Sequence, residues 1–145
     1  MDFMTALDIS ASALSADRTT LNTISMNLAN VKTTRTAQGG PYRRRTVVRA
    51  ATDVDDPFST HMRSALDREL KGVRVSGIAF DNRPLKRVYE PGHPDADKEG
   101  YVLYPDINVV EEMANMMTAQ RNYEANVTTV DTIKGMYSKA LEIGR

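Results

Sequence analysis

Leucines recur every seven residues near the start of the chain, and this spacing constrains the fold more than any other feature of the sequence. Seven residues make two turns of an α-helix, so the leucines and the apolar residues spaced three and four from them form one stripe. No proline or glycine interrupts the segment. We predict a long helix in residues 1–34, ended by Thr33, Thr34 and the turn at 39–41. The stripe comprises Phe3, Leu7, Leu14, Leu21, Ile24, Leu28 and Val31.

The stripe is thinly apolar for a helix that would build a core by itself. Asp17 and Arg18 fall on it, and serine and threonine fill much of the rest. An ordinary amphipathic helix packed on its own domain remains open. A helix this polar is better stabilised by a partner helix, and we expect one.

A second heptad pattern occupies the other end of the chain. Nine positions alternate spacings of three and four, and seven of them are apolar or aromatic. Asn108 precedes the pattern and Glu111 stands three residues later, as in a capping box, so we predict a helix in 106–145. The nine positions are Met113, Met116, Gln120, Tyr123, Val127, Val130, Lys134, Tyr137 and Leu141.

The middle of the chain holds all six prolines and six of the eight glycines. Short β-type runs there predict strands, and 57–70 is expected to be a short helix or a mobile loop. We predict an α+β fold. Residues 1–34 and 106–145 form a discontinuous helical, coiled-coil domain, and 35–105 form a β-rich middle region with a mobile segment at 51–71. The predicted strands are Arg44–Ala50, Gly72–Phe80, Lys86–Tyr89 and Tyr101–Tyr104.

The composition excludes several classes of protein. Nineteen basic residues balance nineteen acidic ones, which gives no support for a nucleic-acid partner. No apolar run is long enough to cross a membrane, and the absence of cysteine excludes disulfides and thiolate metal sites. Asp2 stands where a signal peptide is positive and Asp8 breaks the apolar stretch, so we expect this segment to remain in the mature protein.

Sites for chemistry are equally sparse. The two histidines lie far apart, and no catalytic or phosphate-binding motif is present, so we expect neither an enzyme nor a cofactor. Asp95, Asp97 and Glu99 resemble the first half of a calcium loop. The prolines at 91 and 94 exclude the helix that enters such a loop, and an Asp-rich turn between strands is the favoured interpretation.

Arg43, Arg44 and Arg45 form a basic run. In a neutral chain, three such residues are more typical of a solvated strand edge, or of salt-bridge donors between subunits, than of a nucleic-acid site. Asn126 and Thr128 match a glycosylation motif, which we discount because it lies on the C-terminal helical pattern.

Several segments together resemble the family of flagellar rod and hook axial proteins, and its proximal-rod branch most closely. Leu28–Thr34 resembles the N-terminal signature of that family, an Ala-Asn pair followed by threonine. The resemblance covers nearly the whole chain except 51–71. The further segments that carry it are Gly39–Arg45, Tyr89–Asp97, Gly100–Val102, Tyr104–Met113 and Lys139–Arg145.

This resemblance implies a structural subunit. Family members place their terminal helices together as an inner layer, stack helically into the rod that crosses the periplasm, and transmit torque for motility. They are exported by the flagellar type III apparatus without a cleaved signal peptide. The implied partners are further copies of the chain, other rod proteins and the basal-body adaptor, with no membrane insertion. The expected assembly interface is Phe3, Leu7, Leu14, Leu21, Ile24, Leu28, Asn30, Val31, Met113, Met116, Tyr123, Val127, Val130, Tyr137 and Leu141.

Two alternatives remain. A stand-alone binding module would pair its two helices within one molecule and bind a ligand through its β-rich insertion. A calcium-binding or hydrolytic domain is the third hypothesis, although the sequence offers no nucleophile and base that can be paired for it.

Overall fold

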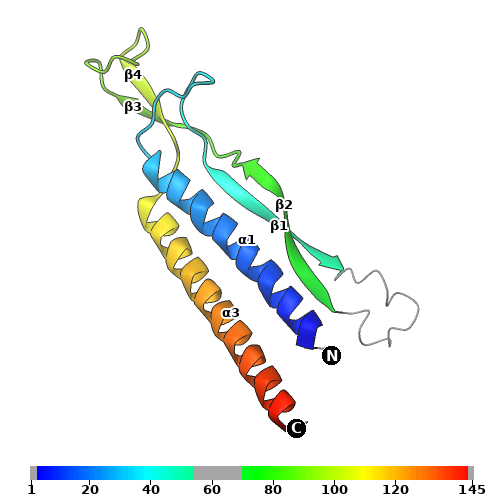
Figure 1. The fold of residues 1–145 in the computed structure, drawn as a ribbon. Coiled ribbons are helices and arrows are strands. Elements are labelled where there is room, and N and C mark those ends of the chain that lie inside the picture. Colours follow the sequence, from blue (N-terminus) through cyan, green and yellow to red (C-terminus); the bar gives the residue numbers. More distant parts are fainter. Residues whose placement is uncertain (1–2, 54–69, 144–145) are drawn as a thin grey trace.

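The computed structural model describes residues 3–53 and 70–143. Two long helices, α1 (Phe3–Ala29) and α3 (Val109–Ile143), lie side by side and run in opposite directions (Figure 1). The predicted fold class, two long terminal helices packed together with a small β-rich insertion in the middle of the chain, is confirmed. In the described part of the chain, neither helix is long and apolar enough to cross a membrane.

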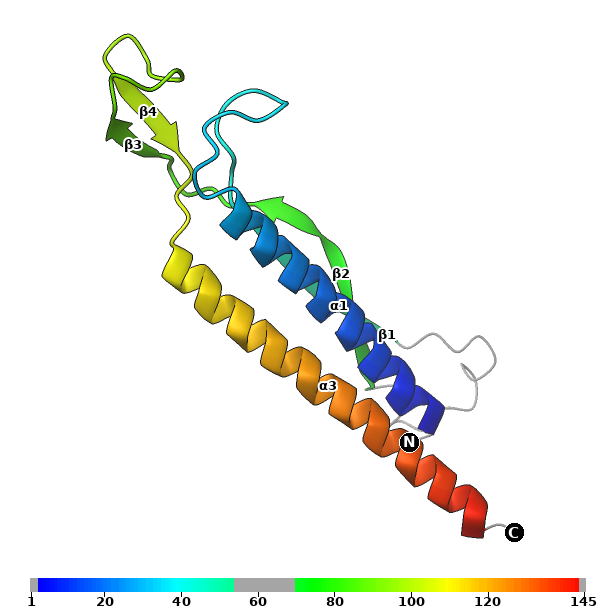
Figure 2. The same cartoon turned by 60° about the vertical axis from the view of Figure 1, so that its left-hand side comes forward.

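The middle of the chain forms two separate antiparallel ribbons. β1 (Arg45–Asp53) pairs with β2 (Lys71–Phe80), and β3 (Lys86–Tyr89) pairs with β4 (Tyr101–Tyr104). Figure 2 shows α1 between α3 and the β1–β2 ribbon, with the β3–β4 hairpin beyond the C-terminal end of α1. Because α1 is covered on two sides, it is the central element of the fold.

α1 buries small and polar side chains more deeply than its leucines. Ser10, Asp17 and Ile24 form a heptad row displaced by three positions from the leucines, which are half-buried. Small side chains allow α3 and the ribbon to approach the helix closely. The buried hydroxyl groups remain satisfied because Ser10 and Thr23 donate to the carbonyl oxygens four residues earlier, both at 2.9 Å.

α1 ends at Ala29, earlier than the Thr33–Thr34 boundary that the sequence suggested. At the end of the helix, the side chain of Asn30 donates to the carbonyl oxygen of Met26 at 2.8 Å, beside the backbone N–H of the same residue at 3.1 Å. The chain then reverses direction through a turn containing Gly39, whose φ of 87° favours glycine. The backbone N–H of Tyr42 closes the loop on the oxygen of Thr33 at 3.1 Å.

All four predicted strands are present, two of them with the predicted bounds. Arg45 pairs with Phe80 at one end of the long ribbon and Asp53 with Lys71 at the other, and a bulge interrupts the register after Val48. The flanks of segment 51–71 therefore belong to strands. The short helix or loop expected at 57–70 falls almost wholly outside the described residues. In the shorter hairpin, Val102 of β4 is fully buried.

α3 begins as the sequence predicts. Oδ1 of Asn108 accepts the backbone N–H of Val110 at 3.0 Å, which satisfies a free donor of the first turn. The second half of the predicted capping box takes a different partner, because the carboxylate of Glu111 accepts hydrogen bonds from Arg83 at 3.2 and 3.3 Å.

Candidate assembly site

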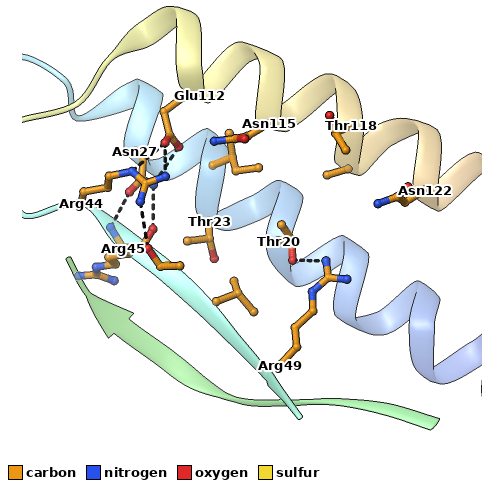
Figure 3. Close-up of a pocket in the computed structure, with 14 residues that line it drawn as sticks. Thr20, Thr23, Asn27, Arg44, Arg45, Arg49, Glu112, Asn115, Thr118 and Asn122 are labelled. Atoms are coloured by element: carbon orange, nitrogen blue, oxygen red, sulfur yellow. Dashed lines mark hydrogen bonds and ion pairs between the residues drawn. The ribbon is translucent and has the colours of Figure 1, made fainter. Parts of the chain in front are cut away.

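The side-chain amide of Asn27 marks the point where α1, β1 and α3 meet (Figure 3). Asn27 is 1% exposed. Its oxygen accepts hydrogen bonds from the backbone N–H of Arg45 at 2.9 Å and from the hydroxyl of Tyr42 at 3.0 Å. Its nitrogen donates to the backbone oxygen of Arg45 at 2.9 Å and to Oε2 of Glu112 at 3.1 Å. Both donors and both acceptor positions of the amide are therefore used, which fixes its orientation.

Glu112, on the first turn of α3, is a buried carboxylate with a matched cation. Its Oε1 accepts from Nε and Nη2 of Arg44 at 2.8 and 2.6 Å, and Nη1 of Arg44 donates to Asp81 at 3.0 Å. Burial alone would lower the pKa of Arg44, but the hydrogen bonds that it donates to Glu112, together with the charge of that carboxylate, outweigh burial and raise the pKa. A carboxylate stays buried only where its charge is matched in this way. We call Asn27, Tyr42, Arg44, Asp81 and Glu112 the Asn27 junction.

Arg83 extends the junction to the surface. Its Nε lies 3.2 Å from Asp81, and its Nη2 lies 3.2 Å from Glu111 on α3. Loss of water would raise the pKa of Asp81, but the hydrogen bonds from the Arg83 backbone and from Arg44 hold that pKa below its ordinary value. The hydrogen bond from Arg83 likewise lowers the pKa of Glu111. The start of α3 is thus held by two arginines from the middle region.

A second polar contact ties the same three elements together further along α1. Asp17 is 2% exposed, and its Oδ1 lies 2.9 Å from Nη2 of Arg49 on β1. Its Oδ2 accepts a hydrogen bond from Asn126 of α3 at 2.9 Å, and Arg49 also donates to Thr20 at 2.7 Å. The charge that weakens the apolar stripe therefore joins α1 to both neighbours, and Asn126 is held between the helices.

A groove of about 290 Å³ lies over α1 between these two contacts. Its floor is α1, and its walls come from β1 and α3 (Figure 3). Small polar side chains line it along both helices, and three arginines of the middle region stand at its edge. It holds no grouping of nucleophile and base, and across the described ranges no group of acidic or histidine side chains is arranged to hold a metal ion.

The residues expected at the assembly interface fall into two sets. Ile24 is buried, and the rest of the N-terminal stripe, together with Met116 and Val130, is half-buried within the monomer. The second set is exposed on α3, although one member, Tyr137, also contacts Phe3 of α1. It comprises Met113, Tyr123, Val127, Tyr137 and Leu141.

The Asp-rich turn is occupied by hydrogen bonds of the chain itself. Oδ1 of Asp97 accepts the backbone N–H groups of Glu99 and Tyr101, both at 2.9 Å, and the bond from Tyr101 is the main cause of a lowered Asp97 pKa. Arg87 pairs with Glu99 at 2.8 Å. This arrangement is the turn between strands that the sequence favoured over a calcium loop.

The buried members of the junction were not singled out from the sequence. Asn27 and Glu112 are polar residues of a type usually found at the surface, and neither belongs to the apolar patterns of the two helices. Of the three arginines in the basic run, only Arg44 contributes its side chain to the junction. No pattern in the sequence pairs it with a carboxylate 68 positions away.

Comparison with known proteins places this architecture in a family. A family model described as "Flagella basal body rod protein" matches residues 7–35, and one described as "Flagellar basal body rod FlgEFG protein C-terminal" matches residues 98–143. The two matches cover most of α1 with the residues that follow it, and β4 with α3.

Curated relatives match the chain over its whole length. The flagellar basal-body rod protein FlgC of Borreliella burgdorferi is 41% identical, covering 99% of this chain and 98% of its own. The FlgC proteins of Bacillus subtilis and Salmonella typhimurium are 41% and 39% identical and cover 97% and 100% of both chains. The chain belongs to the FlgC family of flagellar basal-body rod proteins, as the resemblance in its sequence indicated.

Proposed function

We propose that this FlgC family member is a structural subunit of the flagellar basal-body rod, required for motility, and that it works by packing rather than by catalysis. Full-length similarity to proteins named as basal-body rod proteins is the observation that carries this proposal. The structure adds support, because the terminal helices are joined to each other and to β1 by buried polar contacts. Such a body transmits force without sliding at its internal seams.

We infer that neighbouring subunits cover the exposed apolar residues of α3. Large apolar side chains exposed in a row mark interaction surfaces more often than they mark free surface. Met113, Met117 and Leu141 are each more than half exposed. The partners we propose are further copies of this chain, other rod proteins and the adaptor at the rod base, with the rod in the periplasm.

Export without cleavage of an N-terminal signal is part of the same proposal. α1 is integral to the fold from its first turns, because Phe3 packs edge-on against Tyr137 with ring centres 6.0 Å apart. Ser12 accepts the backbone N–H of Val73 at 3.1 Å. Removal of this segment would expose α3 and the long ribbon, so we expect the exported chain to retain it.

Deletion of the gene tests the function. We expect cells without the chain to be non-motile and to lack rods in purified basal bodies, and the wild-type gene supplied in trans to restore both. Normal rods in the deletion strain would refute the proposal. Sedimentation at rising concentration separates it from the stand-alone module, which would stay monomeric at every concentration.

A further inference from the structure

Arg45 carries a guanidinium group with no carboxylate partner in the described part of the chain. Its Nε is buried and makes no hydrogen bond there. Its guanidinium carbon lies 5.7 Å from the ring centre of Tyr42 and 5.5 Å from that of Phe80. Aromatic rings attract a cation but offer its N–H groups no acceptor in their plane. A carboxylate arriving from outside would supply acceptors for the two terminal guanidinium nitrogens, which are not buried, in a bidentate geometry that arginine favours.

The surroundings of Arg45 are apolar and open. Arg45 pairs with Phe80, and Val47 with Ile78, across β1 and β2, so the four side chains share one face of the ribbon. Phe80 is 61% exposed and Ile78 46%. Arg45 and Val47 also line the groove over α1, and Figure 3 shows Arg45 beside the end of β2. We call these four residues the Arg45 ledge, which continues the groove onto β2.

α3 carries a complementary surface, which we call the acidic stripe. Its members alternate spacings of four and three, and every one is exposed. In the described ranges neither of its two carboxylates forms an ion pair. The acidic stripe consists of Met113, Met117, Gln120, Glu124, Val127 and Asp131.

The acidic stripe cannot reach the ledge of its own molecule. Asn115, Thr118 and Asn122 are the α3 residues that face the groove beside α1. At 3.6 residues per turn, the acidic stripe lies on the opposite flank of α3. A contact between the ledge and the acidic stripe must therefore join two molecules, with the groove side of one facing the far side of the next.

We propose that α3 of a second copy docks over the groove and the Arg45 ledge, with Glu124 or Asp131 of its acidic stripe pairing with Arg45. Charge favours this occupant, because Arg45 and the two carboxylates have no ion-pair partner among residues 3–53 and 70–143, and each is flanked by apolar side chains. The two surfaces differ, so the contact is heterologous and repeats without closing, as a helical assembly requires. The inference rests on the proposed rod function and specifies one contact within it.

Cysteine cross-linking tests the contact directly, because the natural chain has no cysteine. We would combine Phe80→Cys with Glu124→Cys, and separately with Asp131→Cys, as the only gene copy, and oxidise isolated basal bodies. We expect a covalent dimer of the chain from at least one pair and none from the single variants. As a matched control, Leu103→Cys on β4, 43% exposed, replaces Phe80→Cys and should give no dimer. Assembled rods without a dimer from either pair would overturn the proposal.

Charge reversal supplies an independent readout. Arg45→Glu should reduce the number of assembled basal bodies at least about tenfold, because like charges then oppose each other at the contact. Glu124→Arg or Asp131→Arg in the same chain should restore assembly. Urea unfolding of the purified Arg45→Glu chain should stay cooperative, because the backbone bonds to Asn27 remain, but at a lower midpoint, because the contacts with the Tyr42 and Phe80 rings are lost. The second charge reversal does not restore those ring contacts, so recovered assembly reports the contact between molecules. Equal assembly by the Arg45→Glu variant would contradict the proposal.

The deletion strain keeps the two proposals apart. If rods form without the chain, the proposed function fails. If rods require the chain, and the cysteine variants assemble without cross-linking, only the contact between ledge and acidic stripe fails.

Discussion

Asn27 and Glu112 stand 85 positions apart in the sequence, and a 3.1 Å hydrogen bond joins their side chains across the two terminal helices. The same amide binds the backbone of Arg45 in both directions as the chain enters β1. Moving α3 along α1 by one turn, about 5.4 Å, would break this bond together with the Arg44–Glu112 pair. The junction therefore sets the position of α3 relative to both α1 and the long ribbon.

Replacing Asn27 with alanine should destabilise the chain by about 3 kcal/mol. The change leaves the Tyr42 hydroxyl, two backbone groups of Arg45 and part of Glu112 without their partner, and each buried unsatisfied group costs about 1–3 kcal/mol before water enters to relieve some of them. Urea unfolding of the purified chain measures the loss. Asn22→Ala, exposed on the same helix, is the control and should change stability by less than about 0.5 kcal/mol. A loss in Asn27→Ala no larger than that in Asn22→Ala would show that the fold does not depend on the Asn27 hydrogen bonds.

The Arg44–Glu112 pair should show strong energetic coupling. Removal of Arg44 leaves the buried Glu112 carboxylate unmatched, which costs about 3–5 kcal/mol. Removal of Glu112 costs less, because Arg44 keeps Asp81 as its partner, and removal of both costs less than the sum of the two. A double-mutant cycle with Arg44→Ala and Glu112→Ala, followed by urea unfolding, gives the coupling free energy. The exposed Arg87–Glu99 pair is the matched control and should couple by less than about 1 kcal/mol. A coupling free energy for Arg44–Glu112 no larger than that for Arg87–Glu99 would contradict the expectation.

Local patterns were sufficient to predict the elements of this fold. The period of 3.6 residues separates both helices from the middle region, and valine with tyrosine gives β3 and β4 with their observed bounds. The cap at Asn108 is equally local, because it depends on residues two and three positions ahead. Each of these features is determined by neighbours in the sequence, so periodicity and propensity were enough.

The junction could not be predicted because it depends on partners that are distant in the sequence. The leucine stripe suggested which face of α1 would be deepest, but Ser10 and Asp17 are buried more completely because α1 is covered from two sides. A polar residue is buried only if an acceptor or a countercharge meets it, and Arg49 and Asn126 come from other elements. The residues near Asp17 in the sequence do not indicate that Arg49 and Asn126 will be its partners.

Acid should weaken the fold through Asp81. Its pKa is lowered in the folded chain from an ordinary value of 3.8, where the effect of burial is outweighed by hydrogen bonds from Arg83 and Arg44. A group with a depressed folded pKa contributes stability above its unfolded pKa and loses that contribution as the pH falls through the folded pKa. Asp81→Asn should therefore flatten the decline in stability below about pH 4. Unfolding free energies measured at a series of pH values test this, with Asp8→Asn on the exposed side of α1 as the control. If the unfolding free energy of the Asp81→Asn chain falls below about pH 4 as steeply as that of the natural chain, Asp81 is not the cause of the decline.

Gly100 should tolerate alanine less well than two other glycines, for two separable reasons. Its φ of 82° is strained for any other residue, and an added Cβ would lie 2.9 Å from the Tyr89 ring and 3.2 Å from Pro91. We expect Gly100→Ala to cost about 1–3 kcal/mol and to speed amide hydrogen exchange in β3 and β4. Gly39→Ala has the same backbone strain, but its added Cβ would meet open space. Gly77→Ala has no backbone strain, and its added Cβ would also meet open space. The losses in unfolding free energy should therefore rank Gly100 first, Gly39 second and Gly77 last. Equal losses at Gly100 and Gly39 would show that the Tyr89 ring moves aside without cost.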